Sequence, residues 1–100
     1  MVFIINNKKY DTEKMKKIAD VKKWYSLDSW IIDSMFGKKD MGRIYDCELW
    51  KSEKGNWLLT HEVDYCKKIG EAIEEEEAKS LLIKYDLSVY ESMYETIEEA

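Results

Sequence analysis

Proline is absent from this chain, and only two cysteines, one histidine and four glycines occur among its 100 residues. The lack of a proline-rich or low-complexity linker, together with a length that supports one modest core, indicates a single domain spanning residues 1–100. No apolar run approaches the roughly 20 residues that cross a bilayer, and residues 1–5 are too short for the apolar region of a signal peptide. We therefore expect a soluble cytoplasmic protein with no membrane partner.

The scarcity of cysteine and histidine argues against catalysis and against metal binding. The single histidine, His61, lies within an alternating strand pattern, and no nucleophile turn or phosphate-binding glycine loop accompanies it. A zinc site built from Cys47, His61 and Cys66 would lack both a closely spaced ligand pair and a fourth ligand of the usual type. We expect both cysteines to be reduced, partly buried thiols. The sequence thus predicts a protein that is not an enzyme and holds no cofactor or metal.

Charge is distributed unevenly along the chain. Residues 1–50 carry ten basic and eight acidic side chains, whereas residues 51–100 carry six basic and thirteen acidic ones, so the halves have net charges of +2 and −7. From Glu71 onward, ten acidic residues are accompanied by only Lys79 and Lys84. Helix-start electrostatics and a solvated helix face explain part of this excess. The remainder favours a basic protein partner and disfavours direct contact with nucleic acid.

The first quarter of the chain is expected to form a hairpin followed by a helix. The stretch VFIINNKKY contains an apolar strand, an Asn6-Asn7 pair that tolerates positive φ in a tight turn, and a returning strand. In the following stretch DTEKMKKIADVKKWY, Asp11 or Thr12 provides an N-cap, and the apolar residues recur at helical spacing. The expected face consists of Met15, Ile18, Ala19 and Lys22. The sequence predicts an amphipathic helix here, with a lysine-rich outer side.

The centre of the chain has the alternation typical of an antiparallel hairpin. In residues 45–50, every second residue (Tyr45, Cys47, Leu49) is expected on one face of a strand, and Asp46, Glu48 and Trp50 on the other. Residues 57–63 show the same period, with Trp57, Leu59, His61 and Val63 on one face. Between them, Gly55 can adopt the left-handed conformation that a short connecting loop needs. Trp50 and Trp57 are therefore expected near the turn end of this strand pair, where one or both can hold the strands together.

The remaining segments complete an α+β pattern. Residues 26–42 suit either a short helix ended by Gly37 or a structured loop, and residues 67–73 suit an edge strand. One helix is expected from Glu74, where a run of acids suits the positive end of the helix dipole. Another is expected from Ser88, which begins a capping-box pattern. We predict the α+β class: a small antiparallel sheet built from hairpins, with helices packed on one face.

Lysines and aromatic residues offer two further surface features. Seven lysines between residues 8 and 23 lie near aromatic side chains, which is a composition typical of nucleic-acid binding. Acidic residues interrupt this cluster and the rest of the chain is acidic, so a solvated lysine face is the preferred interpretation. Most of the thirteen aromatic residues are expected in the core. Trp30 and Trp50 are the best candidates for exposed anchors of an interface.

The stretches INNKKYDTEKMKKIA and LWKSEKGNWLL resemble those of a lineage of short phage and mobile-element proteins of Gram-positive bacteria. In that lineage an I-N-G-K-x-Y-D-T hairpin precedes a helix, a central L-Y-x-T-x-K-G-N-W-F-L hairpin follows, and an E-E-E-A segment begins another helix. The matching residues are 5–12, 49–59 and 75–78; Asn7 replaces the glycine of the pattern, and the tryptophan-bearing segment 24–36 departs from it. The resemblance implies a mobile-element accessory protein and, by analogy, an inhibitor of host defence such as an anti-CRISPR protein.

These observations and the resemblance lead to one preferred function and two alternatives. The preferred function is a non-enzymatic, stoichiometric inhibitor of a host defence nuclease, whose acidic helices block a basic nucleic-acid-binding region of a CRISPR nuclease complex in the bacterial cytoplasm. The alternatives are a small nucleic-acid-binding or regulatory module that uses the lysine-rich first helix, and an antitoxin or immunity protein. The expected partner-binding residues are Trp30, Trp50, Glu74, Glu75, Glu76, Glu77, Asp86, Glu91, Glu95 and Glu98.

Overall fold

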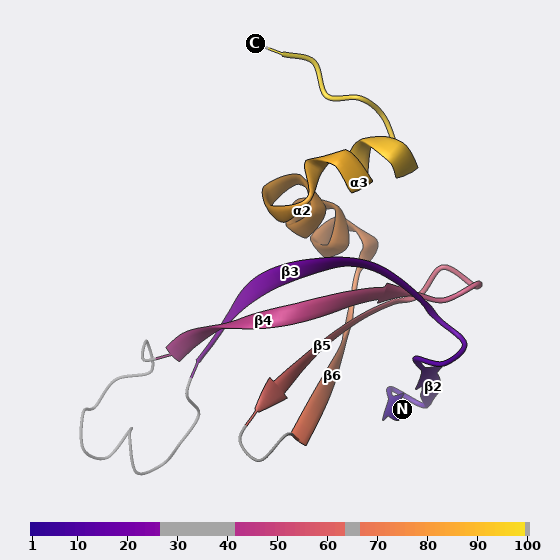
Figure 1. The fold of residues 1–100 in the computed structure, drawn as a ribbon. Coiled ribbons are helices and arrows are strands. Elements are labelled where there is room, and N and C mark those ends of the chain that lie inside the picture. The colour runs from indigo at the N-terminus through magenta and orange to yellow at the C-terminus, as the bar shows by residue number, and fades with distance from the viewer. Residues whose placement is uncertain (27–41, 64–66, 100) are drawn as a thin grey trace.

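The computed structural model describes residues 1–26, 42–63 and 67–99. They form a two-stranded hairpin, a four-stranded antiparallel sheet of order β3-β4-β5-β6, and two helices (Figure 1). The strands are β1 (Val2–Ile5), β2 (Lys8–Asp11), β3 (Lys16–Ser26), β4 (Gly42–Lys51), β5 (Trp57–Val63) and β6 (Lys67–Ile73). The helices are α2 (Glu75–Tyr85) and α3 (Leu87–Met93). The predicted α+β class, with hairpins forming the sheet, is confirmed.

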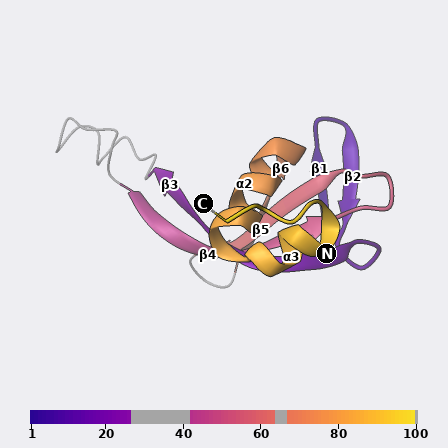
Figure 2. The ribbon, with the colours of Figure 1, turned by 90° about the horizontal axis from the view of Figure 1, so that it is seen from above.

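The four-stranded sheet lies between the helices and the first hairpin (Figures 1 and 2). Helix α2 packs against the sheet and contacts β3 and α3, whereas β1 contacts β6. Because side chains alternate along a strand, every second residue of β3, β4 and β5 faces α2. These residues and two from α2 form the main core: Ala19, Val21, Cys47, Leu49, Trp57, Leu59, Ala78 and Leu82.

The first hairpin covers part of the opposite face of the sheet. Tyr10 of β2 is only 7% exposed, and Leu58 and Thr60, which point to this face of β5, are fully buried. Gly70 of β6 lies so close to Phe3 that an added Cβ would be 2.7 Å from the ring. The hairpin is therefore packed on the sheet and adds a small second core.

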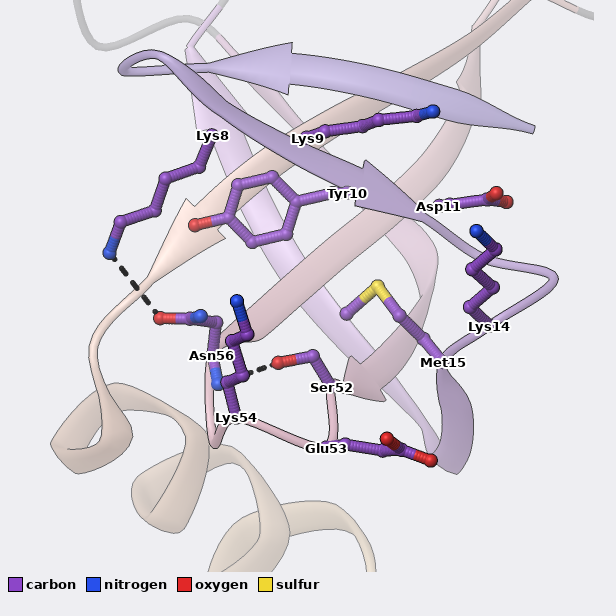
Figure 3. A pocket seen from close by; sticks show the side chains of 10 residues that line it. All are labelled: Lys8, Lys9, Tyr10, Asp11, Lys14, Met15, Ser52, Glu53, Lys54 and Asn56. Atoms are coloured by element: carbon purple, nitrogen blue, oxygen red, sulfur yellow. Dashed lines mark hydrogen bonds between the residues drawn. The ribbon is translucent and has the colours of Figure 1, made fainter.

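Both predicted tight turns are present. Asn6 and Asn7 have φ values of 51° and 64°, as a primed two-residue hairpin turn requires. Gly55 has a φ of 89° in the loop between β4 and β5. In that loop the Ser52 amide donates to the Asn56 carbonyl oxygen at 2.9 Å, and the Asn56 amide donates to Ser52 Oγ at 3.0 Å (Figure 3). These two hydrogen bonds between Ser52 and Asn56 join the two ends of the loop.

The helix predicted over residues 11–25 is wrong, because most of this segment is strand β3. Asp11 is the last residue of β2, and its Oδ1 accepts a hydrogen bond from the Glu13 amide at 3.1 Å in the turn that follows. Strand β3 then pairs with β4 from Lys16 to Ser26, with a register shift between residues 17 and 19. The β-branched and aromatic residues of this segment suit a strand, and the long partner strand satisfies its backbone groups. Pairing across the sheet therefore outweighs the local helical spacing.

The other predicted elements agree with the structure with small differences in their bounds. The edge strand over residues 67–73 is β6, and α2 has Glu74 as its N-cap. Helix α3 begins at Leu87 with Asp86 as its N-cap, so Ser88 lies in the first turn and does not cap. Residues 27–41 of the segment predicted as helix or loop lie outside the described residues.

Candidate functional site

Helices α2 and α3 and the segment 94–99 that follows them, which we call the helical layer, carry exposed carboxylates. The first turn of α2 carries three glutamates, which suits the positive end of the helix dipole. Tyr94, which follows α3, donates a hydrogen bond from its hydroxyl to Glu75 Oε2 at 3.3 Å, so the start of the C-terminal acidic segment lies beside this turn. We name the exposed carboxylates of this layer the acidic surface: Glu74, Glu75, Glu76, Glu95, Glu98 and Glu99.

Two of the predicted partner-binding acids are engaged inside the helical layer. Asp86 Oδ1 caps α3 by accepting hydrogen bonds from the Val89 amide at 3.4 Å and from the Ser88 hydroxyl at 3.0 Å. Glu91 Oε2 accepts a hydrogen bond from the Ile97 amide at 3.0 Å. These carboxylates hold the helix end and the segment after it, so they are less available to a partner than the acidic surface.

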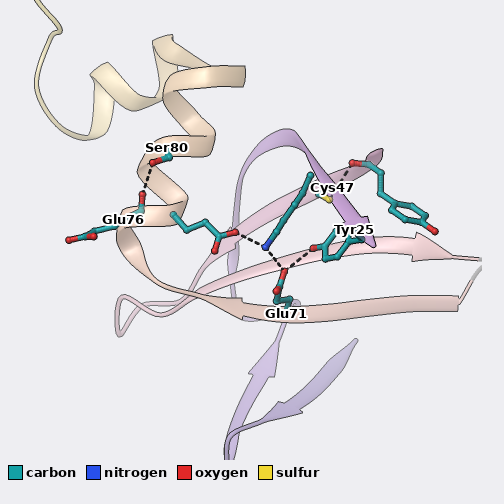
Figure 4. Close-up of polar contacts among 8 residues, drawn as sticks. Tyr25, Cys47, Glu71, Glu76 and Ser80 are labelled. Carbon is teal, nitrogen blue, oxygen red and sulfur yellow. Dashed lines mark hydrogen bonds and ion pairs between the residues drawn. The ribbon is translucent and has the colours of Figure 1, made fainter. Parts of the chain in front are cut away.

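Glu77 is also engaged, in a network that joins α2 to the sheet (Figure 4). Lys23 Nζ lies 2.6 Å from Glu77 Oε2 and 2.9 Å from Glu71 Oε1, and the Tyr25 hydroxyl donates to Glu71 Oε1 at 2.8 Å. Burial acts to lower the pKa of Lys23, but the hydrogen bonds that its ammonium donates to Glu77 and Glu71 outweigh burial and raise that pKa. Burial, followed by Glu71, raises the pKa of Tyr25. These four groups are therefore structural.

The tryptophans lie in different environments. Trp50 is half-buried and its indole Nε1 donates to Thr60 Oγ1 at 3.0 Å, so it packs on the hairpin side of the sheet. Trp57 is 2% exposed on the helix side, so the two residues that flank the central loop point to opposite faces. Trp24 is 48% exposed and pairs in register with Ile44, which is also exposed. Trp30 lies outside the described residues.

His61 and Cys47 face the helix side of the sheet, where aromatic rings surround the histidine. The His61 ring stacks on Tyr25, with centroids 4.5 Å apart, and lies 4.8 Å from the Tyr45 ring. Burial lowers the pKa of His61 and raises the pKa of the Cys47 thiol to about 11, so both groups are neutral near pH 7. Cys66 is outside the described residues, among which no group of three His, Cys, Asp or Glu side chains could hold a metal ion.

Most lysines predicted to line a helix form ion pairs on the sheet. Lys17 Nζ lies 2.9 Å from Asp20 Oδ1 and 3.2 Å from Glu48 Oε2. Lys22 Nζ lies 2.6 Å from Asp46 Oδ1. The nucleic-acid surface proposed on a lysine-rich helix therefore does not exist in that form.

The chain matches no protein-family model, no curated protein and no solved structure. In the part of the chain that the structure describes, no helix is both long enough and apolar enough to span a membrane. Conclusions about function therefore rest on the positions of the residues themselves.

The structure divides the ten predicted partner-binding residues into three groups. Glu74, Glu75, Glu76, Glu95 and Glu98 are exposed on the helical layer. Trp50, Glu77, Asp86 and Glu91 have internal partners, and Trp30 is not described. The exposed Trp24 was missed because a helix was expected over residues 11–25, and Ile44 because the strand was expected to begin only at Tyr45. The alternation of Val21, Lys23 and Tyr25 was the signal that would have placed Trp24 on the other face of a strand.

Proposed function

We propose that the protein is a non-enzymatic, stoichiometric inhibitor that binds a basic surface of another protein through its acidic surface. The observation that carries this proposal is the set of exposed carboxylates on the helical layer, which lack compensating cations. Lys79 and Lys84 are the basic residues of the two helices, and neither forms an ion pair with a described residue. The excess negative charge is thus available to a partner.

Charge complementarity explains how such a surface would inhibit. Like charges at this density repel one another in the free protein, and a basic partner relieves that repulsion. Complementary potentials also accelerate association and exclude partners of the same sign. A protein channel that binds nucleic acid is lined with lysine and arginine, so carboxylates can occupy it in place of phosphates. Binding of the acidic surface and binding of nucleic acid would then be mutually exclusive.

The target that we propose is a host defence nuclease, and specifically a CRISPR nuclease complex. This part of the proposal is supported by the resemblance of residues 5–12, 49–59 and 75–78 to phage and mobile-element proteins. Trp24 and Ile44 form an exposed apolar pair on the face of the sheet opposite to α2, so they could contact only a different part of the target from the acidic surface, and Trp30 stays a predicted anchor.

Titration of the purified protein into a cleavage assay with a CRISPR nuclease tests this proposal. A stoichiometric inhibitor should abolish cleavage near equimolar concentration. The variant Glu74→Gln/Glu76→Gln/Glu95→Lys/Glu98→Lys should weaken inhibition by about tenfold or more, equivalent to roughly 1.4 kcal/mol. These side chains make no hydrogen bond to a described residue, so the fold should persist, as circular dichroism would show.

A matched control separates the acidic surface from net charge. The variant Glu13→Lys/Glu53→Lys/Glu62→Lys also changes the charge by +6, at three exposed residues outside the helical layer. It should inhibit almost as well as the unmodified protein. An equal loss of inhibition in both variants, or no loss in the acidic-surface variant, would contradict the acidic-surface mechanism. If the unmodified protein never inhibited the nuclease, the proposed target would be wrong.

A further inference from the structure

A groove separates the first hairpin from the loop between β4 and β5 (Figure 3). Its volume is about 830 Å³, and four lysines line it: Lys8, Lys9, Lys14 and Lys54. Lys8 and Lys9 come from β2, Lys14 from the turn before β3, and Lys54 from the loop. Two carboxylates, of Asp11 and Glu53, also line it, so the groove has a net charge of +2. We name it the lysine groove.

The lysines of the groove differ in their partners from several lysines of the sheet. Four lysines of the sheet, Lys17, Lys22, Lys23 and Lys68, form ion pairs with carboxylates, whereas Lys16, Lys51 and Lys67 form none with a described residue. None of the four groove lysines forms an ion pair with a described residue, and Lys8 has only a 3.5 Å hydrogen bond to Asn56 Oδ1. These four ammonium groups are exposed and are not neutralised by an ion pair with a described residue, so they can attract an external anion.

The chemistry of the lining indicates what kind of anion the groove fits. Lysine presents a compact point charge, which suits a phosphate, whereas paired recognition of carboxylates is a property of arginine, and Arg43 lies on β4 outside the groove. The aromatic residue of the lining, Tyr10, is buried and cannot stack on a base. The groove thus offers contacts to the phosphates of a nucleic-acid backbone, and its aromatic residue cannot recognise a base by stacking.

We propose that the lysine groove binds the phosphodiester backbone of a short stretch of single-stranded nucleic acid, independently of its sequence. A single strand can bend to follow a groove between a hairpin and a loop. The acidic surface shares no residue with the groove, and salt screens its repulsion of an anion. This binding goes beyond the inhibition proposed above and does not depend on it.

Salt dependence of binding to a fluorescent oligothymidylate tests the proposal. Four phosphate contacts to a single strand give a slope of log K against log salt of about −3, which is about a 50-fold loss of affinity between 50 and 200 mM salt. The variant Lys8→Gln/Lys54→Gln removes one lysine from each wall and should reduce the slope to about −1.4. Both side chains are at the surface, so circular dichroism should show an unchanged fold.

The variant Lys67→Gln/Lys84→Gln provides the matched control. It removes two lysines outside the groove, both exposed, and so lowers the net charge from −5 to −7 just as the groove variant does. Its slope should stay near −3. Absence of binding at 50 mM salt, equal slopes for both variants, or tighter binding of polyglutamate or duplex DNA than of the oligothymidylate would each overturn the proposal. None of these outcomes bears on inhibition through the acidic surface.

Discussion

At the residue scale, His61 is buried, and its pKa is influenced by ionisable groups on two other strands, Lys23 on β3 and Glu71 on β6. It is 6% exposed, its Nδ1 has no hydrogen-bond partner among the described residues, and Tyr25 and Tyr45 cover its ring. Burial lowers its pKa most, Glu71 raises it and Lys23 lowers it. Protonation of this histidine therefore conflicts with the folded state.

This burial predicts how the free energy of unfolding depends on pH. The folded-state pKa of His61 lies below its ordinary value of 6.5, so its contribution to stability is present above pH 6.5 and is lost as the pH falls through the folded-state pKa. Because the chain has one histidine, the change between about pH 7.5 and 5.5 is attributable to this residue. Urea unfolding of His61→Gln should show a flatter profile than the unmodified protein, whereas parallel profiles would contradict this assignment.

At the element scale, Gly70 tests how the first hairpin is attached. The variant Gly70→Ala places a Cβ within 2.7 Å of the Phe3 ring and should lower the free energy of unfolding by about 1–3 kcal/mol, because the packed face has no room for it. Thermal or urea unfolding measures the loss. In the background Phe3→Ala the same change should cost much less, and an equal loss in both backgrounds would show that the hairpin does not pack there.

Strand β3 shows which elements a sequence predicts well. The hairpins with Asn6-Asn7 and Gly55 were predictable because the left-handed backbone of a turn restricts residue type locally. Strand β3 was not, because Met15, Ile18 and Ala19 repeat at helical spacing while the alternation from Ala19 to Tyr25 suits a strand equally well. Its partner β4 lies far along the chain, and pairing with it decides between the two patterns.

The same limit applies to the candidate site. The acids at the start of α2 were predictable, since the helix dipole selects them in the first turn. The sequence could not separate Glu77, which pairs with Lys23 from β3, from its exposed neighbours. The lysine groove combines β2, a turn and a distant loop, so no local pattern predicts it.

At the scale of the whole molecule, the two charged surfaces lie on different sides of the fold. The acidic surface belongs to the helical layer, and the lysine groove lies between the first hairpin and the β4–β5 loop, with no residue in common. This arrangement explains how a protein with a net charge of −5 can present a basic groove. Charge separation across the sheet lets each surface attract a partner of opposite sign.

This separation predicts that the two surfaces act independently. Changes at sites that share neither residues nor partners are usually additive. The groove variant Lys8→Gln/Lys54→Gln should therefore inhibit a target nuclease as strongly as the unmodified protein, while the acidic-surface variant should keep the salt slope of oligothymidylate binding. Cleavage assays and fluorescence anisotropy on the unmodified protein and both variants measure the two effects, with Lys67→Gln/Lys84→Gln as the control for oligothymidylate binding because Glu53 of the other control lines the groove. If the groove variant also weakened inhibition, the two surfaces would belong to one interface, in which nucleic acid held by the groove contributes to binding of the nuclease.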